Sequence, residues 1–213
     1  KTIADIAKSF VFIENDCAMV GLGESDSGAG KGFDIMAYIT VSTGVGGARI
    51  VDGKIDRSHF NFEPGQQIID FATEKTLENL VSGKAVQKRY GMHPSEISDP
   101  EIWNEIEKIT AVGVHNSILH WSPDAVVLGG SMIVKKVGIS AENVAKNVSS
   151  LLKAFSIAPV INRAIAEIIR AKITAVFIDR KKKAVRGMNE PTNAARKTTI
   201  ALFIGLANSF ESP

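Results

Sequence analysis

The hydrophobic positions of this chain fall into short apolar runs separated by longer amphipathic stretches. The runs at residues 10–13, 35–41 and 125–128 have the length and β-branched content of buried strands. A further run at 48–55 contains Asp52-Gly53, which favours a hairpin turn because a type I′ turn needs positive φ. These patterns predict a sheet in which at least two strands form a hairpin.

The amphipathic stretches predict helices over about residues 76–90, 101–120 and 141–155, because their apolar residues recur near helical period. Pro100 suits the first turn of the second of these helices. Another helix is expected to begin at Asn15-Asp16, followed by a loop of small residues at 25–32. Strands that alternate with helices around one hairpin indicate an α/β domain with a mixed sheet flanked by helices.

The C-terminal part differs from the rest in composition. Residues 162–197 contain ten Lys or Arg against three Asp or Glu. Within and beyond this basic segment, the pattern predicts a strand at 173–178 and a terminal helix at about 192–210. Contact with nucleic acid is a minority interpretation of the charge, because such runs are usually solvated.

The composition is that of a globular protein, with 45% hydrophobic and 23% charged residues and a net charge of +2. The single cysteine, Cys17, excludes an internal disulfide framework and a Cys-rich zinc site. No apolar run approaches the roughly 20 residues that cross a bilayer, and the first ten residues do not resemble a signal peptide. We therefore expect a cytoplasmic protein without a membrane partner.

Two glycine-rich segments are candidate ligand sites. In Ser-Thr-Gly-Val-Gly-Gly at 42–47, backbone N–H groups can approach an anion closely and Thr43 adds a hydroxyl. The alternative is a tight turn without a ligand. Gly129-Gly130 follows a predicted buried strand and could admit a flat ligand such as a purine, or could simply end the strand.

The pair Asn15-Asp16 stands at a predicted helix start. A carboxylate there can cap the helix, or it can act as a general base toward a substrate hydroxyl. Gly28-Ala29-Gly30-Lys31-Gly32 does not satisfy the spacing of a phosphate-binding P-loop. The four histidines show no metal-ligand spacing, so no metal site is expected.

The order of these pieces is more specific than any single one. Across about residues 3–164 the chain resembles the ROK family of sugar kinases and repressors. The motifs that carry the resemblance are Glu14-Asn15-Asp16-Cys17-Ala18, Gly23-Glu24, Gly28-Ala29-Gly30, Thr40 to Gly47, Phe62-Glu63-Pro64-Gly65, Thr76 to Gly83, and Pro123 to Gly130.

The resemblance implies the actin/hexokinase-like fold, in which two ribonuclease H-like lobes hold ATP and a sugar between them. It implies an ATP-dependent sugar kinase that transfers the γ-phosphate of Mg-ATP to a hexose-type hydroxyl. Asp16 is then the catalytic base. The implied sugar contacts are Asn15, Glu63, Gln66 and Glu78. The implied phosphate and nucleotide contacts are Thr43, Gly44, Gly46, Gly47, Gly129 and Gly130.

The sequence departs from the family pattern in three places. No Asp-x-Gly-x-Thr phosphate segment precedes Asn15, so residues 1–32 are expected to be a remnant of the first lobe, 33–190 the second lobe and 191–213 a terminal helix. Gln66 stands where the family commonly has histidine, and the Cys-rich zinc segment is missing, so no zinc is expected. The basic segment 162–197 does not match.

These departures leave an alternative function open, namely a catalytically inactive ROK-like protein that binds a sugar or a partner chain. A repressor ranks last, because no helix-turn-helix precedes Asn15. An apolar face between lobes is expected to be covered by self-association or by a chain that carries the missing lobe.

Overall fold

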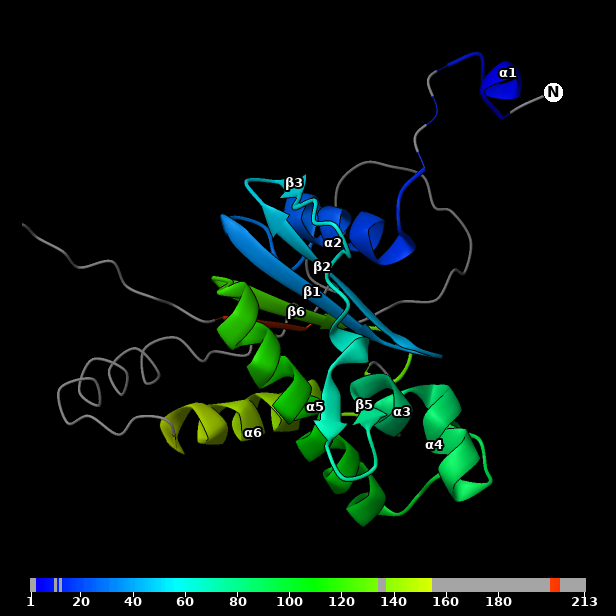
Figure 1. Cartoon of the computed structure of the whole chain (residues 1–213), viewed down its shortest axis with the longest axis vertical. Helices are drawn as coiled ribbons and strands as arrows, with labels where there is room; N and C mark the ends of the chain where they lie inside the picture. The colour runs from blue at the N-terminus through cyan, green and yellow to red at the C-terminus, as the bar shows by residue number, and fades with distance from the viewer. Residues whose placement is uncertain (1–2, 10, 12, 134–136, 155–199, 204–213) are drawn as a thin grey trace, which may run out of the picture.

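The computed structural model describes residues 3–9, 11, 13–133, 137–154 and 200–203. Its centre is a five-stranded sheet in the order β3-β2-β1-β6-β7 (Figure 1). The strands are β1 (Ile35–Val41), β2 (Val45–Val51), β3 (Lys54–Ile55), β6 (Ala125–Gly129) and β7 (Ile200–Phe203). The sheet is mixed, because β1 pairs antiparallel with β2 and parallel with β6, which confirms the predicted class.

Local sequence explains the hairpins of this sheet. Val41 pairs with Val45, so residues 42–44 form the tight loop between β1 and β2. Asp52 and Gly53 have φ of 50° and 68° between β2 and β3, which confirms the turn predicted from this dipeptide.

Helices cover both faces of the sheet (Figure 1). Helix α2 (Asp16–Ser27) lies on one face, and α3 (Leu77–Val81), α4 (Gly83–Tyr90), α5 (Pro100–Trp121) and α6 (Ala141–Ala154) lie on the other. The remaining elements are short: α1 (Ile3–Ala7), the 3-10 turns η1 (Pro64–Gln66) and η2 (Pro94–Glu96), and the two-stranded ribbon of β4 (Ile68–Asp70) and β5 (Lys75–Thr76).

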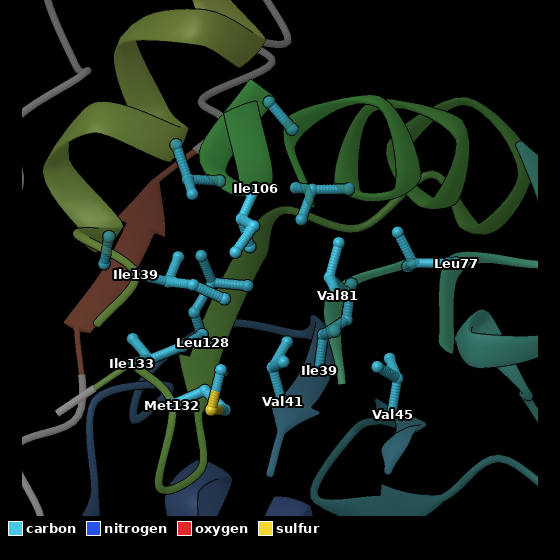
Figure 2. Packing of buried hydrophobic residues seen from close by; sticks show 14 of the residues in the cluster. Ile39, Val41, Val45, Leu77, Val81, Ile106, Leu128, Met132, Ile133 and Ile139 are labelled. Carbon is cyan, nitrogen blue, oxygen red and sulfur yellow. The ribbon is translucent and has the colours of Figure 1, made fainter. Parts of the chain in front are cut away.

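The larger core lies between the sheet and α3, α5 and α6. Ile39 and Val41 of β1 and Leu128 of β6 point into it and meet Val81 and Ile106 from the helices (Figure 2). Alternate residues of the same strands, including Met36, Tyr38 and Val127, pack with Ala18 of α2 in a second cluster. Because successive side chains of a strand point to opposite faces, β1 and β6 are apolar on both sides.

Helix α2 therefore belongs to the same packed unit as the sheet. The sequence interpretation assigned residues 1–32 to a remnant of a separate lobe. The buried Ala18 and the partly buried Leu22 and Ala29 instead contribute to the cluster formed by β1, β2 and β6. Their apolar side chains are covered by the sheet, which is where the hydrophobic effect places them.

The predicted strand at 10–13 is contradicted at the two positions that the structure describes. Val11 and Ile13 lie outside any helix or strand, and Ile13 is 93% exposed, while residues 10 and 12 lie outside the described residues. β-Branched composition favours a strand only where a neighbouring strand supplies hydrogen bonds and packing. No strand of the described part pairs with this segment.

The predicted terminal helix at 191–213 is contradicted at residues 200–203, which form β7. This strand pairs antiparallel with β6, with Leu202 opposite Val126. The free edge of β6 offers backbone donors and acceptors to these residues, and that tertiary pairing overrides local helical preference. The predicted strand at 173–178, the basic segment 162–197 and the rest of the predicted terminal helix lie outside the described residues.

The predicted helix at 76–90 is divided at Ser82, whose backbone is extended (φ −65°, ψ 152°). Thr76 caps α3, and Ser82 caps α4 by accepting a hydrogen bond from the Ala85 N–H at 3.2 Å. Hydroxyl caps of this kind start helices, so a second start within the stretch breaks it. Within the described ranges, none of the helices combines the length and apolar character needed to cross a bilayer.

Candidate functional site

The candidate site lies at the edge of the sheet where β1 and β6 end. Thr40 of β1 is paired with Gly129 of β6, so the loop at 42–44 and the turn at Gly129-Gly130 leave the sheet side by side. The hydroxyls of Ser42 and Ser131 are 3.0 Å apart and link the two. Ligands of open α/β sheets commonly bind at the carboxyl ends of parallel strands.

The loop at 42–44 is held by backbone and carboxylate contacts. The Ser42 N–H donates to the Gly44 carbonyl at 2.8 Å, and the first N–H of α4, from Gly83, donates to the Ser42 carbonyl at 2.7 Å. At the base of the loop, Glu78 Oε2 accepts a hydrogen bond from the Val45 N–H at 2.7 Å.

Two donors of this loop have no partner in the part of the chain that the structure describes. No hydrogen bond among the described residues engages the N–H of Thr43 or of Gly44, and Thr43 is exposed. Successive backbone N–H groups in a tight loop form a concave site for an anion. The loop therefore has the donors that a phosphate requires.

The sequence leaves two roles open for the pair Asn15-Asp16, a helix cap and a general base, and the structure gives the cap to Asn15. Asn15 caps α2, because its Oδ1 accepts from the Ala18 N–H at 3.2 Å. Asp16 is the first residue of the helix, and its Oδ1 accepts from the Cys17 N–H at 2.9 Å while the side chain stays exposed. With the cap provided by Asn15, the Asp16 carboxylate is accessible to a substrate.

Cys17 connects this helix start to β2. A Cβ added to Gly46 would lie 2.6 Å from Cys17 Sγ, so only glycine leaves room for the thiol. Burial, followed by the negative charge of Asp16, the hydrogen bond to Asp16 and the charge of Glu63, raises the pKa of the Cys17 thiol to about 11. The thiol is thus neutral and lies among carboxylates.

Glu63 reaches the site because the backbone around it crosses β2 closely. A Cβ at Gly65 would collide with the Val45 carbonyl, and one at Gly47 would lie 2.8 Å from Pro64 Cγ. Burial raises the pKa of Glu63, and the nearby Glu78 carboxylate adds to the rise. Asp16 and Glu63 both lie close enough to raise the pKa of the Cys17 thiol, and Glu63 lies near Glu78, which contacts the Val45 N–H at the base of the loop. Carboxylates from three separate segments are therefore neighbours at this end of β2.

Two glycines expected from the sequence to contact phosphate also have a packing role. Gly46 and Gly47 lie within β2 and make room for Cys17 and Pro64. In the same segment, the N–H groups of Thr43 and Gly44 have no partner among the described residues.

Gly129, the last residue of β6, and Gly130, which follows it, are also required by packing. Gly129 lies against the Tyr38 hydroxyl, where a Cβ would come within 2.7 Å of the oxygen. Gly130 has φ of 103°, and a Cβ there would collide with the Val41 carbonyl. Only glycine accommodates this turn so close to the end of β1.

Gln66 lies at the end of η1, where its side chain is exposed. Its neighbour Gln67, which sequence reasoning missed, contacts the protein interior. Gln67 Nε2 donates to the Pro64 carbonyl at 3.0 Å and to Ser117 Oγ at 3.1 Å, which anchors η1 to α5. Nothing in the local pattern distinguishes the two glutamines. Cys17 and Ser131 were also missed as site neighbours, because each contacts a residue that is distant in the chain, Gly46 and Ser42 respectively.

Among the described residues, no group of three or more His, Cys, Asp or Glu side chains is arranged to hold a metal ion.

The comparisons with known proteins agree with this fold. A model of the ROK family matches residues 1–175. The chain is 30% identical over 138 residues to a fructokinase of Zymomonas mobilis subsp. mobilis, covering 58% of this chain and 46% of that protein. It is also 30% identical over 146 residues to the xylose repressor of Bacillus subtilis, covering 58% of this chain and 38% of the repressor.

Among solved structures, the ROK hexokinase from Thermus thermophilus superposes with a TM-score of 0.64 at 22% identity, covering 74% of this chain and 61% of that one. The fold is therefore the actin-like ATPase fold expected from the sequence. This chain belongs to the ROK family. It spans about half the length, or less, of the curated relatives it matches.

Proposed function

We propose that this chain carries the sugar-binding side and one phosphate-binding loop of an ATP-dependent sugar kinase. The observation that supports this most is the neighbourhood of three acidic side chains, Asp16, Glu63 and Glu78, near a loop whose Thr43 and Gly44 N–H groups have no partner among the described residues. Carboxylates accept hydrogen bonds from sugar hydroxyls, and the N–H groups of Thr43 and Gly44 can donate hydrogen bonds to phosphate oxygens. Acceptor and donor substrates then meet at one edge of the sheet.

The chemical step assigns one proton transfer to the protein. The Asp16 carboxylate accepts the proton of a sugar hydroxyl while the hydroxyl oxygen bonds to the γ-phosphorus of ATP. The bond from the γ-phosphorus to the bridging oxygen breaks, and ADP leaves. Phosphoryl transfer depends mostly on positioning and electrostatics, so an aspartate held at a helix start suffices as the base.

The remaining residues bind and orient the substrates. Asn15, Glu63 and Glu78 would orient the sugar, with Gln66 at the margin, and Thr43 with Gly44 would contact the phosphates. The turn at Gly129-Gly130 would receive the nucleoside. Mg²⁺ would arrive with the nucleotide, because it binds phosphate oxygens and needs few protein ligands.

A second candidate function is sugar binding without catalysis. The equal identity to a fructokinase and to a repressor favours keeping it, since the sequence is as similar to one as to the other. Both functions use the same sugar contacts. They differ in whether ATP also binds, so that Asp16 can activate the sugar hydroxyl for attack on the γ-phosphate.

Calorimetric titration tests the proposal, with hexoses and N-acetylhexosamines added in turn to the chain in the presence of Mg-ATP. Sugar binding should be lost in Glu63→Ala and Asp16→Asn and kept in Asp26→Asn, a matched change at an exposed position of the same helix. Phosphate transfer from Mg-ATP to a bound sugar by the natural protein would select the kinase. A folded protein that binds no sugar of the panel would refute both candidates.

A further inference from the structure

We propose that Glu78 is a positioning residue for the donor phosphate loop, so that binding of ATP depends on it before any sugar is present. This inference rests on the proposed function of the same site. It gives Glu78 a task that differs from contacting the sugar.

The Glu78 carboxylate contacts the loop directly. Glu78 Oε2 accepts from the Val45 N–H at 2.7 Å, and a Cβ at Gly44 would lie 2.7 Å from the same oxygen. The carboxylate therefore lies directly against the loop, and glycine at 44 leaves room for it. A hydrogen bond to an ionised acceptor is stronger than one between neutral groups.

Helix α3 fixes the reach of this carboxylate. Thr76 and Asn79 form a capping box at its start, and Leu77, next to Glu78, is 1% exposed. A side chain that starts from a rigid helix has few ways to follow a loop that moves. The hydrogen bond from the Val45 N–H to Glu78 thus holds the base of the loop against a rigid helix.

The break at Ser82 provides the second tie. In a continuous helix the N–H groups of Gly83 and Lys84 would be used within the helix. Here they donate to the Ser42 and Thr43 carbonyls at 2.7 and 3.4 Å. With both ends of the loop tied, the N–H groups of Thr43 and Gly44 remain as its unused donors among the described residues. Loss of the Glu78 tie would leave the Val45 N–H without its acceptor and free that end of the loop.

The direction in which substitution of Glu78 changes ATP affinity distinguishes a positioning role from simple charge repulsion. A carboxylate beside bound phosphate repels it, so removal of the charge alone should tighten ATP binding. Loss of a positioning contact should weaken it. Glu78→Gln keeps the length and an acceptor oxygen but loses the charge, whereas Glu78→Asp keeps the charge but withdraws the oxygen from Val45.

The experiment is a titration with Mg-ATP in the absence of sugar. We expect Glu78→Asp to weaken binding about 3- to 10-fold, as for loss of one hydrogen bond. Glu78→Gln should bind as tightly as the natural protein or more tightly, and Glu101→Gln, at an exposed glutamate of α5, should have no effect. Amide exchange at Val45 should accelerate in Glu78→Asp and not in Glu78→Gln, which reports on the contact without a ligand.

Three results would overturn the inference: unchanged or tighter ATP binding in Glu78→Asp, equal weakening in both variants, or no Mg-ATP binding by the natural protein. If the natural protein binds sugar and no Mg-ATP, the inference fails while the sugar site stands. If it binds Mg-ATP with the expected pattern and no sugar, the inference stands and the sugar kinase assignment fails.

Discussion

Pro64 packs directly on Gly47, so closely that a methyl group at Gly47 would lie 2.8 Å from Pro64 Cγ and 2.7 Å from the Tyr38 carbonyl oxygen. The segment that carries Glu63 is seated on β2 through this contact. The position of Glu63, a proposed sugar contact, therefore depends on Gly47 having no side chain.

Gly47→Ala should destabilise the protein by about 1–3 kcal/mol, because backbone and a proline ring must shift to admit the methyl group. Gly23→Ala is the matched control. Gly23 lies in α2 with nothing within 4 Å of its missing Cβ, so alanine there should stabilise by roughly 0.5–1 kcal/mol through helix propensity. Urea denaturation measures both. Equal stability of Gly47→Ala and the natural protein would contradict the packing described for Pro64.

The Cys17 thiol should react slowly with iodoacetamide. Burial, with Asp16 and Glu63, raises its pKa from 9.0 to about 11, so its thiolate fraction at pH 8 is lower by about 100-fold. The rate should keep rising with pH to about pH 11, and Asp16→Asn should accelerate it. Because Cys17 is the sole cysteine, mass spectrometry reads the reaction without correction. A rate that levels off below pH 9 would exclude the buried thiol.

Glu63 should lower stability at neutral pH. Its folded-state pKa is raised above the ordinary 4.5 by burial and then by Glu78, so the folded protein disfavours the charged form. That cost is present above the folded pKa and disappears as the pH falls through it. Glu63→Gln should therefore raise the Tm at pH 7, and the difference should vanish as the pH falls below 4.5. Glu101→Gln provides the control, and an unchanged Tm in Glu63→Gln at pH 7 would count against the acidic cluster.

Ser82→Ala should cost about 1 kcal/mol through loss of the cap on α4. Ser82 is 2% exposed and its Oγ accepts from the Ala85 N–H, whereas Ser98 is exposed, so Ser98→Ala should change the free energy of unfolding by less than about 0.5 kcal/mol. Since the break at Ser82 directs the Gly83 N–H to the loop at 42–44, Ser82→Ala should also speed amide exchange at Gly83. Equal unfolding energies for the two variants would argue that the helix break does not depend on the hydroxyl.

Local patterns predicted the elements whose causes are local. The strand at 35–41 was predicted with its observed bounds, and the turn at Asp52-Gly53 and the helix start at Asn15-Asp16 follow from residues a few positions apart. The order of the motifs was enough to predict the family and the fold.

The sequence by itself thus determined the α/β class, the ROK ancestry and the candidate residues, because these signals are written in neighbouring positions. Only the tertiary structure decided that Glu78 holds Val45, that Gly47 makes room for Pro64, that a helix breaks at Ser82 and that residues 200–203 join the sheet. Each of these pairs residues distant in the chain or satisfies a backbone group that only the assembled sheet exposes. Packing and hydrogen bonding between distant parts of the chain stabilise such contacts, so local periodicity in the sequence cannot predict them.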